Sequence, residues 1–323
     1  MNSAARKVLL TEQSEATSGD LAEILSGLRQ EQKTLPPKFF YDEHGSELFE
    51  RICELPEYYP TRTELDIMER YAGDMAARTG PLASVIEFGS GASLKTRTLL
   101  EHLERPAAYV PVDISGDHLL AAARSLAQDF PDIEILPVAA DFTRPFPLPD
   151  PKIPPRRNLV YFPGSTIGNF LPDAALDLLR VMHQEAGAGG ALLIGVDLRK
   201  DPAVLERAYN DDRGVTAAFN RNMLYRLNRE FGADFDPAAF QHRAVWNDAM
   251  GRIEMHLVSR EDQTFEIGGE TFTLRQDEFI TTEYSHKYTQ EQFRGLTEAA
   301  GFTVEQVWTD PREWFSVQFC TRD

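Results

Sequence analysis

The stretch SVIEFGSGASLKTRTLL, residues 84–100, decides the fold. An apolar segment, 85–88, leads through Gly89-Ser90-Gly91 into a predicted helix that begins near Ser93 or Leu94. Glycines permit backbone angles and close approaches that a Cβ would block, and a helix start offers unpaired N–H groups. A strand, a glycine turn and a helix in this order form a nucleotide-type cradle, although many strand-to-helix turns carry such glycines for packing alone.

Two further predicted strands end in acidic residues. Segment 108–113 ends in Asp113, about two dozen positions after the first glycine, where a carboxylate can hold ribose hydroxyls. Asp141 and Phe142 follow the segment 132–138 and offer an acceptor for an adenine amine, a backbone N–H and an apolar wall. Because ligands of open parallel sheets bind beyond the carboxyl ends of the strands, we expect these tips to converge.

The central segment, 84–198, alternates predicted strands and helices, which indicates an α/β fold with a mostly parallel sheet covered on both faces. A capped helix from Thr289 to Gly301 and two closing strands follow. A closing antiparallel hairpin is typical of class I methyltransferases. The expected strands are 84–88, 108–113, 132–138, 157–163, 191–197, 303–308 and 314–320, the expected helices are 94–104, 116–128 and 173–186, and the six-proline segment 142–155 is an expected surface loop.

The remaining segments predict a second, α+β module. A helix is expected from Asp20, another after Thr61, and a third from Asp201, followed by a meander that turns at Gly268-Gly269. The aromatic stretch 35–64 predicts either a hydrophobic lid over a core or a substrate wall. We expect a flexible tail at 1–19, a substrate-binding module from 20–60 and 199–284, and a cofactor domain from 61–198 and 285–323.

Composition excludes several partners. The chain has 323 residues and a formal net charge of −18, which argues against nucleic acid and anionic membrane surfaces. No apolar run suggests a signal peptide or a membrane span, two cysteines make no disulfide framework, and the histidines lack metal-ligand spacing. We therefore expect a cytoplasmic, metal-free enzyme that acts as a monomer on a small molecule.

The glycine pattern also bears on the cofactor. A nicotinamide cofactor usually needs a third glycine in its pyrophosphate cradle, and Leu94 stands at that position. This absence, together with the closing hairpin, favours S-adenosylmethionine (SAM) over a nicotinamide dinucleotide. A nicotinamide-dependent reductase remains an alternative, as does a binding protein without catalytic activity.

Six blocks of sequence carry a specific resemblance. They are KFFYDEHGSELFERICELPEYYPTRTE, EFGSGASLKTRTLL, VDIS, FPGSTIGNF, ERAYNDDRGVTAAFNRN, and IEMHL with TEYSHKY. In this order they resemble the histidine-specific SAM-dependent methyltransferase family over essentially the whole chain beyond the N-terminal tail. The resemblance implies methylation of the α-amine of L-histidine to the trimethyl betaine hercynine, the first step of ergothioneine biosynthesis. Another amino acid or a biogenic amine is the alternative substrate.

The resemblance also implies roles for residues at matching positions. Tyr41 and Tyr58 would orient the reacting amine. SAM would lie on Gly89, Lys95, Asp113, Asp141 and Phe142. The amino and carboxylate groups of the substrate would lie among Tyr41, Tyr58, Gly164, Asn169 and Tyr209, and its imidazole among Glu283, Ser285 and Met255.

Overall fold

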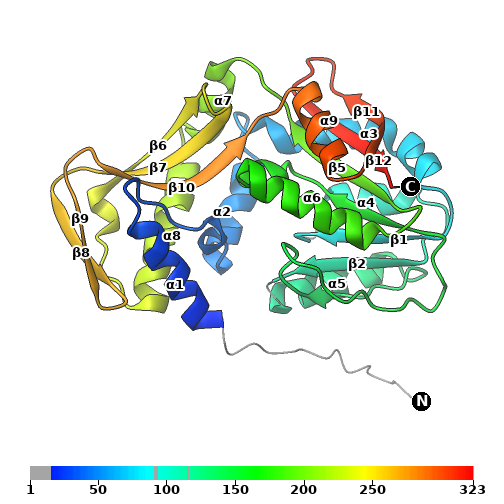
Figure 1. The fold of residues 1–323 in the computed structure, drawn as a ribbon, viewed down its shortest axis with the longest axis horizontal. Helices are drawn as coiled ribbons and strands as arrows, with labels where there is room; N and C mark the ends of the chain where they lie inside the picture. The colour runs from blue at the N-terminus through cyan, green and yellow to red at the C-terminus, as the bar shows by residue number, and fades with distance from the viewer. Residues whose placement is uncertain (1–15, 91–93, 115, 323) are drawn as a thin grey trace.

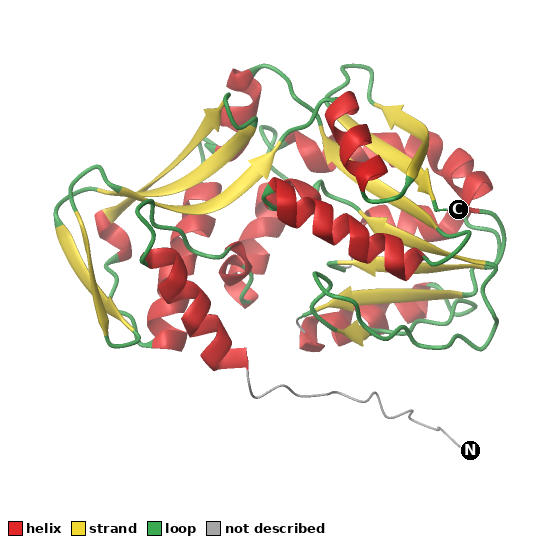
Figure 2. Cartoon of the chain, in the orientation of Figure 1, coloured by secondary structure: helices red, strands yellow, loops and turns green. Residues whose placement is uncertain are grey.

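A computed structural model describes residues 16–90, 94–114 and 116–322 of the chain. Gly91 and the predicted helix start at Ser93 lie outside these ranges, as does most of the predicted tail. Two sheets lie in separate halves of the molecule (Figure 1). The proline-rich segment 142–155, which is described in full, forms neither helix nor strand, as the sequence predicts (Figure 2).

The larger sheet has seven strands in the order β11-β12-β5-β4-β1-β2-β3. Strands β1 to β5 are parallel, whereas β12 pairs antiparallel with both β5 and β11. The predicted parallel sheet with a closing antiparallel hairpin is therefore confirmed. The strands are β1 (Ala83–Phe88), β2 (Ala108–Asp113), β3 (Val138–Ala139), β4 (Arg157–Phe162), β5 (Ala191–Asp197), β11 (Thr303–Thr309) and β12 (Phe315–Thr321).

Helices cover both faces of this sheet. Because β1 and β5 are buried along their whole length, their sequences are mostly apolar rather than alternating, with Ser84, Glu87 and Asp197 as the polar exceptions. Side chains of α6 (Pro172–Ala186) and α9 (Gln290–Ala299) form one core layer with the sheet. Side chains of α3 (Tyr59–Thr79), α4 (Leu94–His102) and α5 (Gly116–Asp129) form the layer on the other face.

The second half of the molecule has its own core around a three-stranded antiparallel sheet, β10-β7-β6. The predicted hairpin is confirmed, with Gly268 and Gly269 both at positive φ between β8 and β9. The elements here are α1 (Ala16–Leu28), η1 (Pro37–Phe40), α2 (Glu43–Cys53), α7 (Pro202–Tyr209), α8 (Val215–Phe231), η3 (Pro237–Ala239), β6 (Phe240–Asn247), β7 (Arg252–Ser259), β8 (Gln263–Ile267), β9 (Glu270–Leu274) and β10 (Phe279–His286).

Three predicted boundaries are wrong. Helix α1 begins at Ala16 rather than Asp20, whose carboxylate accepts from the Lys38 ammonium at 2.7 Å. Helix α3 begins at Tyr59, because Pro60 fits the first helical turn better than Thr61 fits the N-cap. The strand expected at 132–138 shortens to the two residues of β3, with an isolated bridge at Ile135, since Pro137 cannot donate to the ladder.

The two halves join where β5 ends and β10 ends. The Tyr288 N–H donates to the Asp197 carbonyl at 3.1 Å, and the Arg199 N–H donates to the Tyr288 carbonyl at 3.0 Å. These backbone bonds bring the carboxyl edge of the large sheet against the end of the smaller one. Among the described helices, none is long and apolar enough to cross a bilayer.

Candidate active site

The carboxyl ends of the first strands of the large sheet meet at one edge. After β1, Gly89 has a φ of +70°, which glycine adopts without strain, and its N–H donates to the Val112 carbonyl at 2.9 Å. Asp113 ends the neighbouring strand β2 and is half-buried. The structure thus brings together the first glycine and the first acidic residue of the predicted cradle.

Asp141 and Phe142 follow β3 at the same edge, and they differ in the contacts that they make within the protein. The Phe142 ring lies 5.7 Å from that of Phe88, and a Cβ placed on Gly89 would be 3.5 Å from it, an ordinary van der Waals contact. Asp141 is exposed, and its carboxylate accepts from the backbone N–H and the hydroxyl of Thr143 at 3.0 and 2.6 Å. This local turn is the ordinary structural use of an aspartate.

A buried carboxylate, Glu64 on α3, holds two other predicted residues in place. The Lys95 ammonium donates to it at 2.6 Å, and the Gly164 N–H donates to both of its oxygens at 3.0 and 2.9 Å. Glu64 fits only because Gly195 of β5 lacks a side chain, since a Cβ there would come within 2.1 Å of its Oε1. Both oxygens of this carboxylate therefore accept hydrogen bonds inside the protein.

The residue after Gly164 also has a left-handed backbone conformation. Ser165 has a φ of +56°, an uncommon conformation for a residue other than glycine, and its hydroxyl accepts from the Asp197 N–H at 2.9 Å. That bond fixes the turn after β4 against the end of β5. Strained backbone that the surrounding structure holds in place is common at functional sites.

Tyrosine side chains from the second half form an aromatic wall. Tyr58 lies 5.9 Å from Tyr209 in an edge-on arrangement, and Phe49 links Tyr58 to Tyr41. Burial raises the pKa of Tyr58 well above its ordinary value, and the neighbouring Tyr209, Glu283 and Tyr41 raise it further. The structure therefore brings together the predicted tyrosines and Glu283, and it keeps these phenols protonated.

Glu283 on β10 is a carboxylate without a hydrogen-bonding partner in the part of the chain that the structure describes. No hydrogen bond or ion pair reaches its side chain from any residue that the structure describes. Burial raises its pKa to about 7, against the opposing effect of the Lys287 ammonium. A carboxylate left in this state lies ready to bind a polar group of a ligand, because burying it unpaired costs free energy.

Ser285 shares a strand face with Glu283, and the register across β7 is continuous between the two residues. Its hydroxyl lies 2.9 Å from that of Tyr209, and the Lys287 ammonium donates to both, at 2.8 and 3.0 Å. All three side chains are buried. The predicted carboxylate and imidazole residues, Tyr209 and Ser285, are therefore in direct contact.

Asn169 ends a short 3₁₀ helix, η2 (Thr166–Asn169), which lies against β10. Gly168 allows this approach, since a Cβ on it would come within 2.7 Å of the His286 carbonyl oxygen, and His286 Nδ1 bonds the Gly168 carbonyl at 2.9 Å. The Asn169 amide has no bond to any other described residue. Met255 lies opposite Glu283 in the ladder, with its side chain in the second core.

Comparison with known proteins now identifies the family. A model of the family described as "Histidine-specific methyltransferase, SAM-dependent" matches residues 20–322. The chain belongs to this family.

Three relatives of the methyltransferase are informative. The histidine N-alpha-methyltransferases of Mycolicibacterium smegmatis and Mycobacterium tuberculosis are each 40% identical to it, over 93% of this chain and 94% of theirs. Ergothioneine biosynthesis protein 1 of Neurospora crassa is 32% identical over 87% of this chain, which matches 32% of that larger protein. The predicted SAM dependence, class I fold and enzyme class are thus confirmed, and the nicotinamide and non-catalytic alternatives are wrong.

Four polar residues of this methyltransferase were not predicted from sequence: Tyr59, Glu64, Asp197 and Lys287. Asp197 ends a parallel strand as Asp113 does, and Lys287 continues the alternation that starts with Glu283 and Ser285. Both signals were therefore visible. The residues that bond to these four, by contrast, lie up to 141 positions away in the chain.

Proposed function

We propose that this methyltransferase uses SAM to methylate the α-amine of L-histidine three times, yielding hercynine, the first step of ergothioneine biosynthesis. The observation that carries the proposal is the unpartnered Glu283 carboxylate beside the Ser285 hydroxyl. A neutral imidazole has one nitrogen that donates and one that accepts, and an imidazolium donates from both, so the ring can bond the Glu283 carboxylate together with a Ser285 hydroxyl that either donates or accepts. The two mycobacterial relatives, which are histidine N-alpha-methyltransferases, support the same substrate.

In this proposal the second core and its surroundings, 20–60 and 199–284, form the substrate-binding module. Residues 61–198 and 285–323 form the cofactor domain. Asn169 and Tyr209 bind the substrate carboxylate, Met255 lines the imidazole end beneath Glu283, and the amine lies among Tyr41, Tyr58 and Gly164. The unbonded Asn169 amide supports this assignment, because a carboxylate can accept from it.

The edge of the large sheet fits SAM. The left-handed turn at Gly89, the half-buried Asp113 and the Phe142 ring lie together, and Lys95 is held against Gly164. We assign the cofactor to Gly89, Lys95, Asp113, Asp141 and Phe142, with Asp113 on the ribose hydroxyls. When bound, SAM supplies an electrophilic methyl group on a sulfonium centre.

The chain's own residues have a limited chemical task. The α-amino group has an ordinary pKa of about 7.7–8.0, so a modest effect of the site keeps its lone pair available without a strong base. Tyr41 and Tyr58 orient the amine through protonated hydroxyls. Their ring faces favour the methylated, cationic products, and close, in-line positioning supplies the rest of the rate enhancement.

Mass spectrometry of histidine incubated with the enzyme and SAM tests the proposal. We expect successive gains of one, two and three methyl groups on the α-nitrogen. Tryptophan, other amino acids and histamine are assayed in parallel. Turnover of one of these in preference to histidine would replace the proposed substrate with another amino acid or a biogenic amine, and accumulation of a monomethyl product alone would refute trimethylation.

A further inference from the structure

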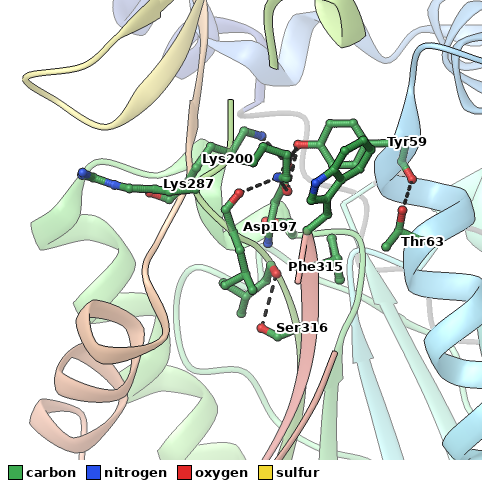
Figure 3. A network of polar contacts seen from close by, with 12 residues as sticks. Tyr59, Thr63, Asp197, Lys200, Lys287, Phe315 and Ser316 are labelled. Carbon is green, nitrogen blue, oxygen red and sulfur yellow. Dashed lines mark hydrogen bonds and ion pairs between the residues drawn. The ribbon is translucent and has the colours of Figure 1, made fainter. Parts of the chain in front are cut away.

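Lys287 is a buried cation that bridges the two halves of the molecule. Its ammonium group lies 2.8 Å from a carboxylate oxygen of Asp197, at the end of β5 (Figure 3). It also donates to the hydroxyls of Tyr209 and Ser285. Only 2% of its surface is exposed. An ammonium has three hydrogens, so these three partners use all of them.

The two hydroxyls that Lys287 contacts, those of Tyr209 and Ser285, have one hydrogen left for a ligand. Both hydroxyl oxygens accept from Lys287, and a single hydrogen bond joins Tyr209 to Ser285. Two hydroxyl hydrogens are present and one lies between the oxygens, so one remains. No other acceptor within the described chain takes it. A buried O–H without an acceptor is costly, so the site requires an acceptor from a ligand.

The charges around Lys287 favour an anion. Asp197 is fully buried and pairs with two ammonium groups, those of Lys287 and Lys200, while Tyr59 donates to its carboxylate at 2.7 Å (Figure 3). Burial opposes ionisation of Asp197, but the two lysines outweigh it and hold its pKa below the ordinary value. In direct ion pairs one carboxylate thus faces two ammonium groups, while Glu283 and Asp310 act on these lysines without a direct ion pair. A ligand carboxylate beside Tyr209 would add a negative charge near Lys287.

We propose that Lys287 is a positioning residue for the substrate carboxylate: it fixes the Tyr209 and Ser285 hydroxyls so that the one remaining O–H points to the ligand, and it adds a positive charge behind them. The inference rests on the proposed histidine site and deepens it. A carboxylate is the strongest acceptor a histidine offers, so Tyr209 donates to it while Ser285 donates to Tyr209. Ser285 then has only a lone pair left for the imidazole.

The test replaces Lys287 with methionine, which keeps the length of the side chain and removes its charge and donors. Calorimetry with saturating S-adenosylhomocysteine measures the dissociation constant of histidine. We expect about a 10- to 100-fold weaker binding of histidine, the range for hydrogen bonds to charged groups. Binding of histamine, which has no carboxylate, should change far less, and so should binding of S-adenosylhomocysteine.

Lys200→Met is the matched control, since Lys200 contacts Asp197 and Tyr59 but neither site hydroxyl. Its effect on histidine binding should be much smaller. In a Tyr209→Phe background, Lys287→Met should lose most of its effect, because it acts through that hydroxyl. If Lys287→Met does not fold, Lys287→Gln, which keeps a donor, should fall between wild type and the full loss.

Two outcomes would overturn the inference. One is unchanged histidine affinity in Lys287→Met or Lys287→Gln, and the other is an equal loss for histidine and histamine, which marks a merely structural lysine. Failure of the wild-type enzyme to bind or methylate histidine would instead refute the proposed function, so the two failures are distinguishable.

Discussion

Two glutamates with different surroundings define two different regions of this methyltransferase. Glu64, at the cofactor edge, is saturated: an ammonium and a backbone N–H occupy both of its oxygens. Glu283, beside the tyrosine wall, has no such bond with any described residue, and burial raises its pKa to about 7. Both carboxylates lie next to the proposed site, yet their surroundings are opposite.

We interpret this difference as structural support by Glu64 and recognition of a ligand by Glu283. A saturated carboxylate such as Glu64 stabilises the turn that presents Lys95 and Gly164, and it has little left for a ligand. An unsaturated one such as Glu283 carries a desolvation cost that a complementary ligand can offset. Their hydrogen bonds therefore predict that substituting Glu64 changes the stability of the protein and the cofactor edge. Substituting Glu283 should change which substrate is bound.

The largest expected effect concerns the carboxylate end of the substrate. Histamine should be methylated with a kcat/KM about 10⁴-fold below that of histidine, because buried polar groups left without partners discriminate strongly. Steady-state assays with both substrates check this. Efficient histamine methylation would show that Asn169 and Tyr209 do not bind a carboxylate.

Glu64→Gln should destabilise the protein by about 3 kcal/mol, since it leaves the Lys95 ammonium without its buried counter-charge. Urea unfolding measures the loss. Asp66→Asn, two residues along the same helix, is the control: its exposed pair with Arg70 should contribute less than about 1 kcal/mol. Equal losses of unfolding free energy in the two variants would contradict the supporting role of Glu64.

The raised pKa of Glu283 predicts a specific pH dependence of stability. The folded protein favours the protonated carboxyl, so this contribution is present below about pH 4.5 and is lost as the pH rises through about 7. Compared with Glu283→Gln, the ligand-free wild type should lose up to about 3 kcal/mol of unfolding free energy between pH 4.5 and pH 8. Urea titrations of both proteins across this range, with the exposed Glu69→Gln as a control, measure it. A pH-independent difference would contradict the unpaired state of Glu283.

The smallest expected effect sharpens the cofactor side of the comparison. Asp113→Ala should weaken S-adenosylhomocysteine binding by about 1.5–3 kcal/mol, the range for charged hydrogen bonds. Asp141→Ala should have a smaller effect, because the Asp141 carboxylate already accepts twice from Thr143. Calorimetry on the two variants ranks them, and the reverse order would exchange their proposed roles.

Much of the fold follows from sequence because its determinants are local. Mostly apolar strands, the Gly89 turn and the Thr289 capping box each depend on residues within a few positions. Element boundaries were less predictable. Asp20 has the composition of an N-cap, but its carboxylate instead pairs with Lys38, eighteen residues away, inside a helix that starts earlier.

The site could be predicted only in part for the same reason. The strand tips at Gly89, Asp113 and Phe142 follow from topology, and family resemblance pointed to the substrate residues. The supporting bonds join distant segments: Glu64 meets Gly164 across 100 residues, and Lys287 meets Tyr209 across 78. No local pattern encodes such pairs, so the bonding partners of Glu64, Asp197 and Lys287 emerge only when the chain is folded.

One measurement tests the central claim most directly. Calorimetry of histidine binding to Glu283→Gln, with saturating S-adenosylhomocysteine, asks whether the unpartnered carboxylate recognises the substrate. We predict a histidine affinity at least about tenfold weaker than in the wild type, with the affinity for S-adenosylhomocysteine unchanged. Wild-type histidine affinity in this variant, or a matching loss for both ligands, would contradict the assignment of Glu283 to substrate recognition.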